Sequence, residues 1–236
     1  MLPLRAFILA GGKGKRLRSV VSDRPKPLAM VNDKPFLEVL IESLRTKGIR
    51  DMVLLTGYKA ESIEDYFSRS KWSYIRFSRE ESPLGTGGAV KNAEAFAADP
   101  TLLVNGDSFF DADVDALLRF HQQKGVGVTL SLVEVEDAGR YGSVIMDEDG
   151  FVKGFMEKPA GPGRPGLVNA GLSLLSLNTI RNLPEQRPFS MENEIFPRLA
   201  ATRQMVGMLQ DKPFYDIGTP ESYEEFKVFM RTNYQQ

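Results

Sequence analysis

The sequence has no cysteine, which excludes disulfide bonds, thiol nucleophiles and cysteine-ligated zinc or iron–sulfur sites. It also lacks an excess of one charge, because 30 lysine and arginine residues stand against 31 aspartate and glutamate residues. A net charge of -1 does not favour nucleic acid or an anionic membrane as a partner, so any anion site has to be local. No apolar run reaches the roughly 20 residues of a membrane span, and no signal-peptide core follows Met1. We expect a cytoplasmic protein with no nucleic-acid or membrane partner.

Strand-like and helix-like patterns alternate over the first half of the chain. Short apolar runs predict strands at 5–10, 52–56, 74–78 and 101–105. Helices are predicted at 36–48, near 60–69, after "GTGGA" (85–89) and near 113–124. Each parallel return of the chain needs a dozen or more residues, and these helices supply them. The pattern predicts a doubly wound α/β fold with a mostly parallel sheet.

The second half changes character, because strand-like segments follow one another there. Strands are expected at 127–135, 142–155 and 167–176, the middle one folded on the turn "DEDG", as antiparallel additions to the sheet. The Pro- and Gly-rich stretch 158–166 is expected to be a flexible lid. Pro220 suits a first helical turn, and a closing helix is predicted over 220–231. We expect residues 1–236 to form one domain.

The stretch "ILAGGKGKRL" joins the first predicted strand to a glycine-rich, basic loop. Ligands of open α/β folds bind at the carboxyl ends of parallel strands, where this loop begins. Gly11, Gly12 and Gly14 let backbone N–H groups approach a phosphate, and Arg16 can contact it through two donors. A Walker loop needs Ser or Thr where Arg16 stands, and the dinucleotide fingerprint needs glycine where Leu17 stands. A phosphate site of another kind is indicated, and a tight turn with solvated basic side chains is the alternative.

Two further segments belong to the same edge of the predicted sheet. Lys26 lies between two prolines, which restrict where its amine can point. The stretch "PLGTGGA" follows a strand and precedes a helix, so its backbone can lie flat against a planar base. The alternative for this second glycine cluster is a helix start that needs small residues for packing.

Two aspartates follow predicted strands and are candidate Mg²⁺ ligands. Asp107 ends the apolar strand "TLLVN" within "VNGD", and Asp216 follows another short strand in "FYDIGTP". Magnesium usually takes one or two carboxylates, with substrate phosphates and waters completing its shell. A helix cap is the competing role for Asp107, but Asp111 and Asp113 are better placed for capping.

Seven motifs in order along the chain resemble those of the sugar-1-phosphate nucleotidyltransferases: "LAGGKGKRL", "PKP", "PLGTGGA", "NGD", "EKP", "NAG" and "DIGTP". The sequence as a whole, including the stretch "DKPFLEVLIESLRTKGI", most resembles the sequences of the guanylyltransferases of this family that act on a heptose 1-phosphate. The resemblance implies a Rossmann-like, GT-A-like fold without an added β-helix domain. Residues 1–125 would mainly bind the nucleotide, and residues 126–236 the sugar phosphate.

The resemblance also implies a reaction, in which a sugar-1-phosphate oxygen attacks the α-phosphorus of a nucleoside triphosphate and expels pyrophosphate. The implied catalytic residues are Arg16, Lys26 and Asp107, and the implied Mg²⁺ ligands are Asp107 and Asp216. The nucleotide would contact Leu9, Gly11, Gly12 and Gly14. Because a phosphate oxygen is already ionised at neutral pH, no strong base is required. The single histidine, His121, is expected on the surface of a helix rather than in catalysis.

The implied specificity residues fall into two groups. Gly85 and Gly87 would line the base pocket, where Glu80 would accept hydrogen bonds from a guanine edge. The sugar phosphate would contact Gly142, Glu157, Lys158 and Asn169. Uracil and thymine also offer a ring N–H, so a uridylyl- or thymidylyltransferase, or an enzyme for another sugar, stays open. The alternatives of another class are a noncatalytic nucleotide-sugar sensor and, with little support, a kinase or ATPase. Self-association also stays open.

Overall fold

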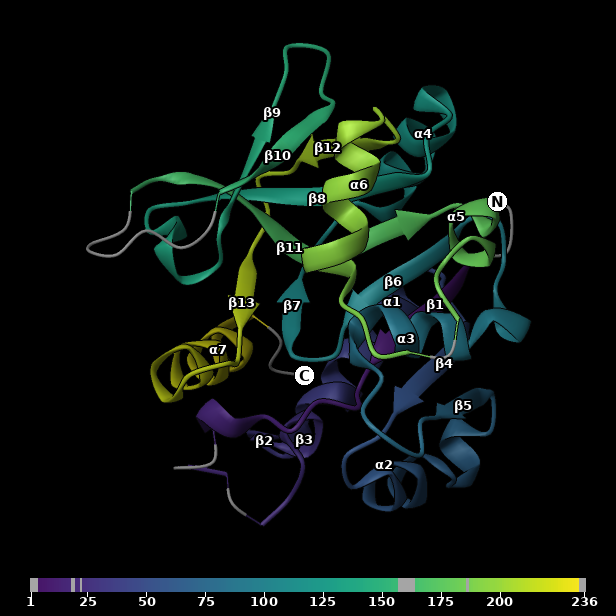
Figure 1. Ribbon diagram of the computed structural model, residues 1–236. Helices are drawn as coiled ribbons and strands as arrows, with labels where there is room; N and C mark the ends of the chain where they lie inside the picture. The colour runs from purple at the N-terminus through teal and green to yellow at the C-terminus, as the bar shows by residue number, and fades with distance from the viewer. Residues whose placement is uncertain (1–3, 18–19, 22, 157–163, 186, 234–236) are drawn as a thin grey trace.

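The computed structural model describes residues 4–17, 20–21, 23–156, 164–185 and 187–233. Its centre is a seven-stranded sheet in the order β12-β8-β11-β6-β1-β4-β5 (Figure 1). The strands are β1 (Arg5–Leu9), β4 (Asp51–Thr56), β5 (Ile75–Arg79), β6 (Thr101–Asn105), β8 (Val128–Val135), β11 (Gly166–Leu175) and β12 (Met205–Leu209). Within this sheet only β11 runs against the other strands. The prediction of a mostly parallel, doubly wound sheet is confirmed.

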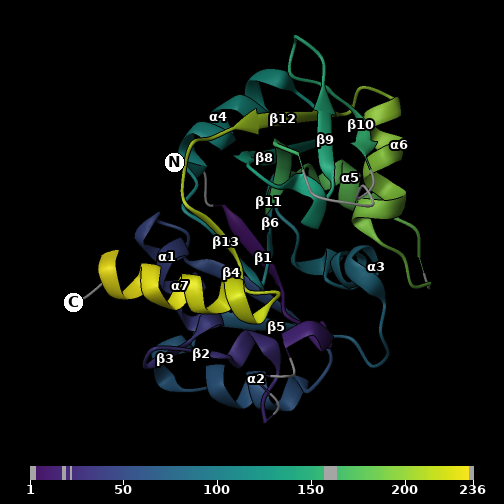
Figure 2. The same ribbon diagram turned by 90° about the vertical axis from the view of Figure 1, so that its left-hand side faces the viewer.

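Helices cover both faces of the sheet. One face carries α1 (Phe36–Thr46), α2 (Ala60–Phe67), α4 (Val114–Lys124) and α7 (Pro220–Asn233). The other face carries α3 (Gly85–Asn92), α5 (Leu177–Arg181) and α6 (Phe196–Ala201). Figure 2 shows α1 and α7 on one side of the sheet and α3, α5 and α6 on the other. No helix in the described part of the chain has the length and apolar character needed to cross a membrane.

The strand β1 shows why the sheet is buried on both faces. Ala6 and Ile8 pack into one apolar cluster, and Phe7 between them packs into the other. Successive side chains of a strand point to opposite faces, so a strand covered on both sides is apolar without interruption. This is the pattern that the apolar run at 5–10 displays.

Three two-stranded pairs complete the fold. The strands β2 (Met30–Val31) and β3 (Lys34–Pro35) form one pair, and β9 (Ser143–Met146) and β10 (Val152–Met156) form the predicted hairpin. The strands β7 (Ser108–Phe110) and β13 (Phe214–Asp216) pair antiparallel, so that Asp216 lies opposite Ser108. This last pair brings a residue near the carboxyl end of the chain beside "VNGD".

Most predicted elements are present with shifts of one or two residues at their ends. The closing helix extends over α7, and Asp113 caps α4 by accepting a hydrogen bond from the Ala116 N–H at 2.8 Å. The strand β12, the helices α5 and α6 and the π-helical turn Met191–Ile195 were not predicted. The lid predicted at 158–166 lies largely outside the described residues.

Candidate active site

A cavity of about 650 Å³ opens at the carboxyl ends of four neighbouring parallel strands. Its walls include residues that follow β1, β4, β5 and β6, namely Gly11, Gly57, Glu80 and Asp107. The predicted site residues that line it are Leu9, Gly11, Gly12, Gly14, Lys26, Glu80, Gly85 and Asp107. These residues are far apart in the sequence and meet because parallel strands end at the same edge.

The basic centre of this cavity is Lys26. Its side chain is 8% exposed, and its Nζ donates a hydrogen bond to Asp107 Oδ2 at 2.7 Å. Gly14 has a φ of +56°, and a Cβ built on it would lie 2.7 Å from Lys26 Cβ. The glycine loop therefore packs directly on the lysine stem. A buried amine with one carboxylate partner is held in place and can bind a further anion.

The second predicted metal ligand, Asp216, lies beside Asp107. The N–H of the next residue, Ile217, donates to the backbone oxygen of Asp107 at 3.0 Å. Burial raises the pKa of Asp216, and so does the negative charge of Asp107, while Lys26 and Arg16 act in the opposite direction. Arg16 lies outside the cavity lining but close to Gly218, where a Cβ would meet its Nη2 at 3.1 Å.

These two carboxylates fit the needs of Mg²⁺. The negative charge of Asp107 disfavours ionisation of Asp216, and a divalent cation between the two carboxylates would relieve this repulsion. The described residues contain no cluster of three or more His, Asp or Glu side chains that could hold a metal by themselves. An ion here would therefore need phosphate oxygens and waters in its shell, as Mg²⁺ usually does.

Glu80 forms the opposite wall of the cavity. Its Oε2 accepts a hydrogen bond from the Leu84 N–H at 3.0 Å, and burial raises the pKa of its carboxyl group although this N–H acts against the shift. A Cβ on Gly11 would lie 3.1 Å from Oε1 of Glu80, and a Cβ on Gly57 would clash with the same side chain. The glycines thus let the carboxylate lie flat against the ends of β1 and β4.

The two glycines that are predicted to line a base pocket differ in their places in the structure. Gly85 lines the cavity, whereas Gly87 does not. Gly87 packs against Phe189, whose ring would clash with any Cβ there, and its N–H donates to the Phe189 oxygen at 3.0 Å. Packing therefore requires a small residue at this helix start, and the contact predicted between Gly87 and a base stays a prediction.

The residues predicted to contact the sugar phosphate lie outside this cavity or outside the described residues. Asn169 is in β11, and its Oδ1 accepts a hydrogen bond from the Gly171 N–H at 3.0 Å. Gly171 abuts Asn105 of the cavity wall, so Asn169 lies near the cavity without lining it. Gly142 precedes the hairpin strand β9. Glu157 and Lys158 lie outside the described residues.

The comparisons with known proteins agree with this geometry. The model of the nucleotidyl transferase family matches residues 5–233. The chain belongs to the nucleotidyl transferase family. Among solved structures, the nucleotidyltransferase resembles HddC from Yersinia pseudotuberculosis, with a TM-score of 0.86, 35% identity and coverage of 96% of this chain and 99% of that one. A structure of that protein complexed with GMP-PN has a TM-score of 0.83 and 33% identity, with the same coverage.

Curated relatives of the nucleotidyltransferase carry guanylyltransferase names. A D-glycero-alpha-D-manno-heptose 1-phosphate guanylyltransferase from Campylobacter jejuni is 38% identical over 229 residues, which cover 95% of this chain and 99% of the relative. A protein of the same name from Aneurinibacillus thermoaerophilus is 37% identical, with 94% and 96% covered. A mannose-1-phosphate guanylyltransferase from Mycobacterium tuberculosis is 36% identical, with 92% and 62% covered.

Several residues of the cavity wall were not singled out from the sequence of this nucleotidyltransferase, among them Gly57, Tyr58 and Glu192. Gly57 and Tyr58 follow the predicted strand 52–56, as Gly11 follows the first strand, so the strand-end rule would have found them. Glu192 lies in an element that was not predicted, and nothing in the local sequence marks it.

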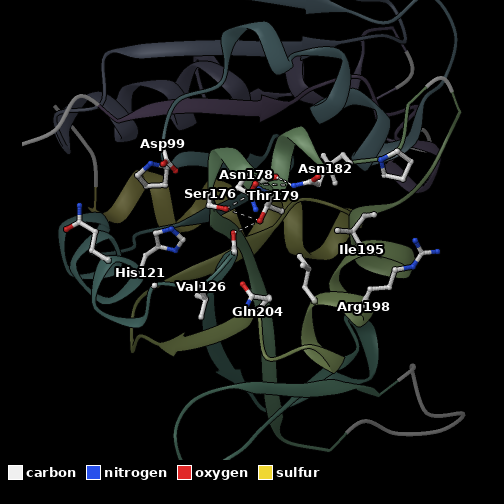
Figure 3. Close-up of a pocket in the computed structure, with 17 residues that line it drawn as sticks. Asp99, His121, Val126, Ser176, Asn178, Thr179, Asn182, Ile195, Arg198 and Gln204 are labelled. Carbon is white, nitrogen blue, oxygen red and sulfur yellow. Dashed lines mark hydrogen bonds between the residues drawn. The ribbon is translucent and has the colours of Figure 1, made fainter.

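A second cavity, of about 780 Å³, lies at the opposite edge of the sheet (Figure 3). It is bordered by residues at the amino-terminal ends of parallel strands, among them Pro100, Gly127 and Gln204. Among the described residues, Arg198 is the one arginine in its lining, and no lysine lines it. A triphosphate with its several negative charges is better matched by the cavity that holds Lys26 and the glycine loop.

The wall of this second cavity includes His121, which was predicted to be exposed. That prediction was wrong, because His121 is 6% exposed and its Nδ1 lies 2.8 Å from Thr129 Oγ1 of β8. His121 is one turn beyond Leu117 on α4, so it shares the face that packs on the sheet. Burial lowers the pKa of the imidazole, although Asp99 acts in the opposite direction. His121 does not line the cavity that holds Lys26.

Proposed function

We propose that this nucleotidyltransferase transfers GMP from GTP to D-glycero-α-D-manno-heptose 1-phosphate and releases pyrophosphate. The observation that carries the proposal is the Lys26–Asp107 pair at 2.7 Å, with Asp216 beside it, in a cavity walled by the glycine loop. The guanine assignment is supported by Glu80 on the facing wall and by the names of two relatives covered over nearly their whole length. A cytoplasmic location fits these small phosphorylated substrates.

The chemistry assigned to the site is direct attack of a sugar-phosphate oxygen on the α-phosphorus. Lys26 would neutralise the reacting phosphates, and Arg16 would meet the triphosphate beyond the glycine loop. Bound at Asp107 and Asp216, Mg²⁺ would offset the charge of the phosphate oxygens and help to orient them. Backbone N–H groups of residues 11–14 would hold the leaving pyrophosphate portion. Because the nucleophile is already ionised, positioning and charge neutralisation supply the rate enhancement.

The sugar side of the reaction is assigned to residues of the second half. Asn169 and Gly142 would contact the sugar, and Glu157 and Lys158 would bind its hydroxyls and phosphate. The position of Asn169 near Asn105, through Gly171, supports this assignment for the first of them.

The test is pyrophosphate release with Mg²⁺ for GTP, ATP, CTP, UTP and dTTP, each paired with the heptose, mannose, glucose or N-acetylmuramic acid 1-phosphate. We expect turnover to be confined to GTP with the heptose 1-phosphate. Lys26→Ala should reduce kcat by about 100-fold or more while GTP binding changes little, because the base contacts remain. Chelation of divalent metal should abolish turnover, and Mg²⁺ should restore it.

A second candidate is mannose-1-phosphate guanylyltransferase activity, favoured by the relative from Mycobacterium tuberculosis. A preference for GTP with mannose 1-phosphate would select it. A preference for UTP or dTTP would keep the enzyme class and overturn the guanine assignment. GTP binding without pyrophosphate release from any pair would favour a noncatalytic sensor and contradict the proposal.

A further inference from the structure

The start of α3, which brings Gly85 and Thr86 into the cavity lining, is bound to a distant segment, residues 189–192. The Phe189 N–H donates to the Leu84 oxygen at 2.9 Å, and the Gly87 N–H donates to the Phe189 oxygen at 3.0 Å. The Met191 N–H donates to Thr86 Oγ1 at 2.9 Å. Three hydrogen bonds therefore join two segments about 100 residues apart in the chain.

A carboxylate completes this contact. Glu192 Oε2 accepts hydrogen bonds from Thr86 Oγ1 at 2.6 Å and from Ser190 Oγ at 2.8 Å. Both hydroxyl oxygens also accept a hydrogen bond. Thr86 Oγ1 accepts from the Met191 N–H, and Ser190 Oγ accepts from the Asn193 N–H at 3.2 Å. Since each hydroxyl has one proton to donate, both need a neighbour that only accepts, and an ionised carboxylate meets that need.

Glu192 is also unusual among the residues of the nucleotide cavity. The other residues that line it come from positions 9–107, so among the residues that the structure describes Glu192 is the one contribution of the second half. It lies in the π-helical turn Met191–Ile195, a geometry frequent at functional sites. Its hydrogen-bond partners among the described residues are hydroxyl groups rather than cations. An unpaired carboxylate in a cavity for a triphosphate would repel the ligand, so its presence needs another reason.

We propose that Glu192 is a positioning residue for nucleotide recognition, acting through Thr86 to hold residues 84–88 in the shape that receives the nucleoside. The inference deepens the proposed function and rests on it. It assigns to the second half of the chain a part in binding the nucleotide as well as the sugar phosphate. Glu192 does not touch the reacting atoms, so its loss affects binding of the nucleotide rather than the chemical step.

The experiment compares variants by the Kd of GTP, measured calorimetrically without sugar phosphate, and by steady-state kinetics. Glu192→Ala should raise the Kd and the KM of GTP about tenfold, the usual size of a lost hydrogen bond to a charged group. The value of kcat and the KM of the sugar 1-phosphate should change less than about twofold. Glu192→Gln keeps an amide oxygen that can accept both hydroxyl protons, and it should restore most of the affinity.

Thr86 provides an independent arm of the same test. Thr86→Val removes the hydroxyl without changing the shape of the side chain, and it should raise the Kd of GTP as Glu192→Ala does. Thr86→Ser keeps the hydroxyl and should behave as the wild type. In the double variant the two effects should not add, because each single change breaks the same link.

The matched control is Glu194→Ala. Glu194 lies in the same turn but does not line the cavity, and its carboxylate pairs with Arg187 at 2.8 Å and accepts from the Ser190 N–H at 3.3 Å, without a contact to Thr86. The same charge is removed from the same turn, so the Kd of GTP should stay within about twofold of the wild type. An equal loss of affinity in Glu194→Ala, or an unchanged Kd in Glu192→Ala and Thr86→Val, would overturn the inference. If the wild type binds GTP without transferring it, the proposed function fails, and the Kd comparison still decides the role of Glu192.

Discussion

Gly14 and Lys26 lie so close together that one methyl group on the glycine would meet the lysine. The added Cβ would lie 2.7 Å from Lys26 Cβ, and the φ of +56° is one that residues with a side chain avoid. Local backbone geometry and the position of the reactive amine are therefore coupled at this one residue.

We expect Gly14→Ala to lower the free energy of unfolding by about 1–2 kcal/mol, because an L side chain is strained in this conformation. It should also reduce kcat, since Lys26 has to move. The control is Gly12→Ala, where nothing lies within 4 Å of the added Cβ, so the ligand-free stability should be unchanged. Urea denaturation of the ligand-free proteins measures the difference, and equal stability of the two variants would contradict the expectation.

The buried imidazole of His121 predicts a dependence of stability on pH. Its pKa in the folded protein is lowered by burial, whereas in the unfolded chain it is about 6.5. Below that pH the unfolded chain binds the proton more readily, so the free energy of unfolding should fall as the pH drops through about 6.5. The contribution is fully present above that value. His121→Gln should reduce the slope between about pH 7.5 and 5.5, and denaturation at several pH values measures it. Identical slopes would show that His121 contributes nothing.

At the scale of elements, β11 packs against the turn that carries Asp107. It is the antiparallel member of the main sheet, and its register shifts between Asn169 and Ser173. Gly171 lies in this irregularity with a φ of +76°, and a Cβ there would lie 3.1 Å from the Cβ atoms of both Asn105 and Ser108. The bulge thus lets β11 approach the turn that carries Asp107.

Gly171→Ala should destabilise the protein by about 1–3 kcal/mol through backbone strain and overpacking. It should also lower kcat, because the Asn105–Ser108 turn has to shift together with Asp107. Gly154→Ala in β10 is the control, since nothing lies within 4 Å of its added Cβ. Thermal denaturation and pyrophosphate release compare the two. A Gly171→Ala enzyme with normal kcat would mean that the turn tolerates the methyl group.

At the scale of the whole molecule, α7 packs against elements from the first half of the chain. Phe226 of α7 is fully buried, and its ring centroid lies 5.3 Å from that of Phe36 and 5.2 Å from that of Phe109. The same apolar cluster extends from Ala6 to Phe226. A cluster shared in this way favours a single cooperative unit, as the sequence predicts.

Unfolding in urea should accordingly follow one transition. The fluorescence of Trp72, which is 2% exposed and belongs to the first half, should change together with the far-ultraviolet circular dichroism of the whole chain. Phe226→Ala should shift both signals equally, with a loss of about 3–5 kcal/mol, because it opens a cavity between distant segments. Val228→Ala, at a side chain that is 54% exposed, should stay within about 0.5 kcal/mol of the wild type. Separate transitions would indicate two folding units.

The strands β1, β4 and β6, which end at the cavity that holds Lys26, could be predicted because they are short, nearly continuous apolar runs. Once β1, β4, β5 and β6 are placed in parallel, Gly11, Glu80 and Asp107 must come to one edge. The element that carries Glu192 could not be predicted, because its short π-helical turn has no strong periodicity. The exposure of His121 was misjudged because a polar ring in a polar stretch gives no sign of its partner Thr129.

The sequence by itself determined the alternation of strands and helices and the order of the motifs, because buried parallel strands and phosphate loops require particular residues at particular positions. Tertiary structure alone decided which of these residues meet. It brought Asp216 beside Asp107 through the pairing of β13 with β7, and it placed Glu192 behind Thr86. It also packed Gly87 against the ring of Phe189. Such contacts depend on the mutual fit of distant segments, and no local pattern of residues encodes that fit.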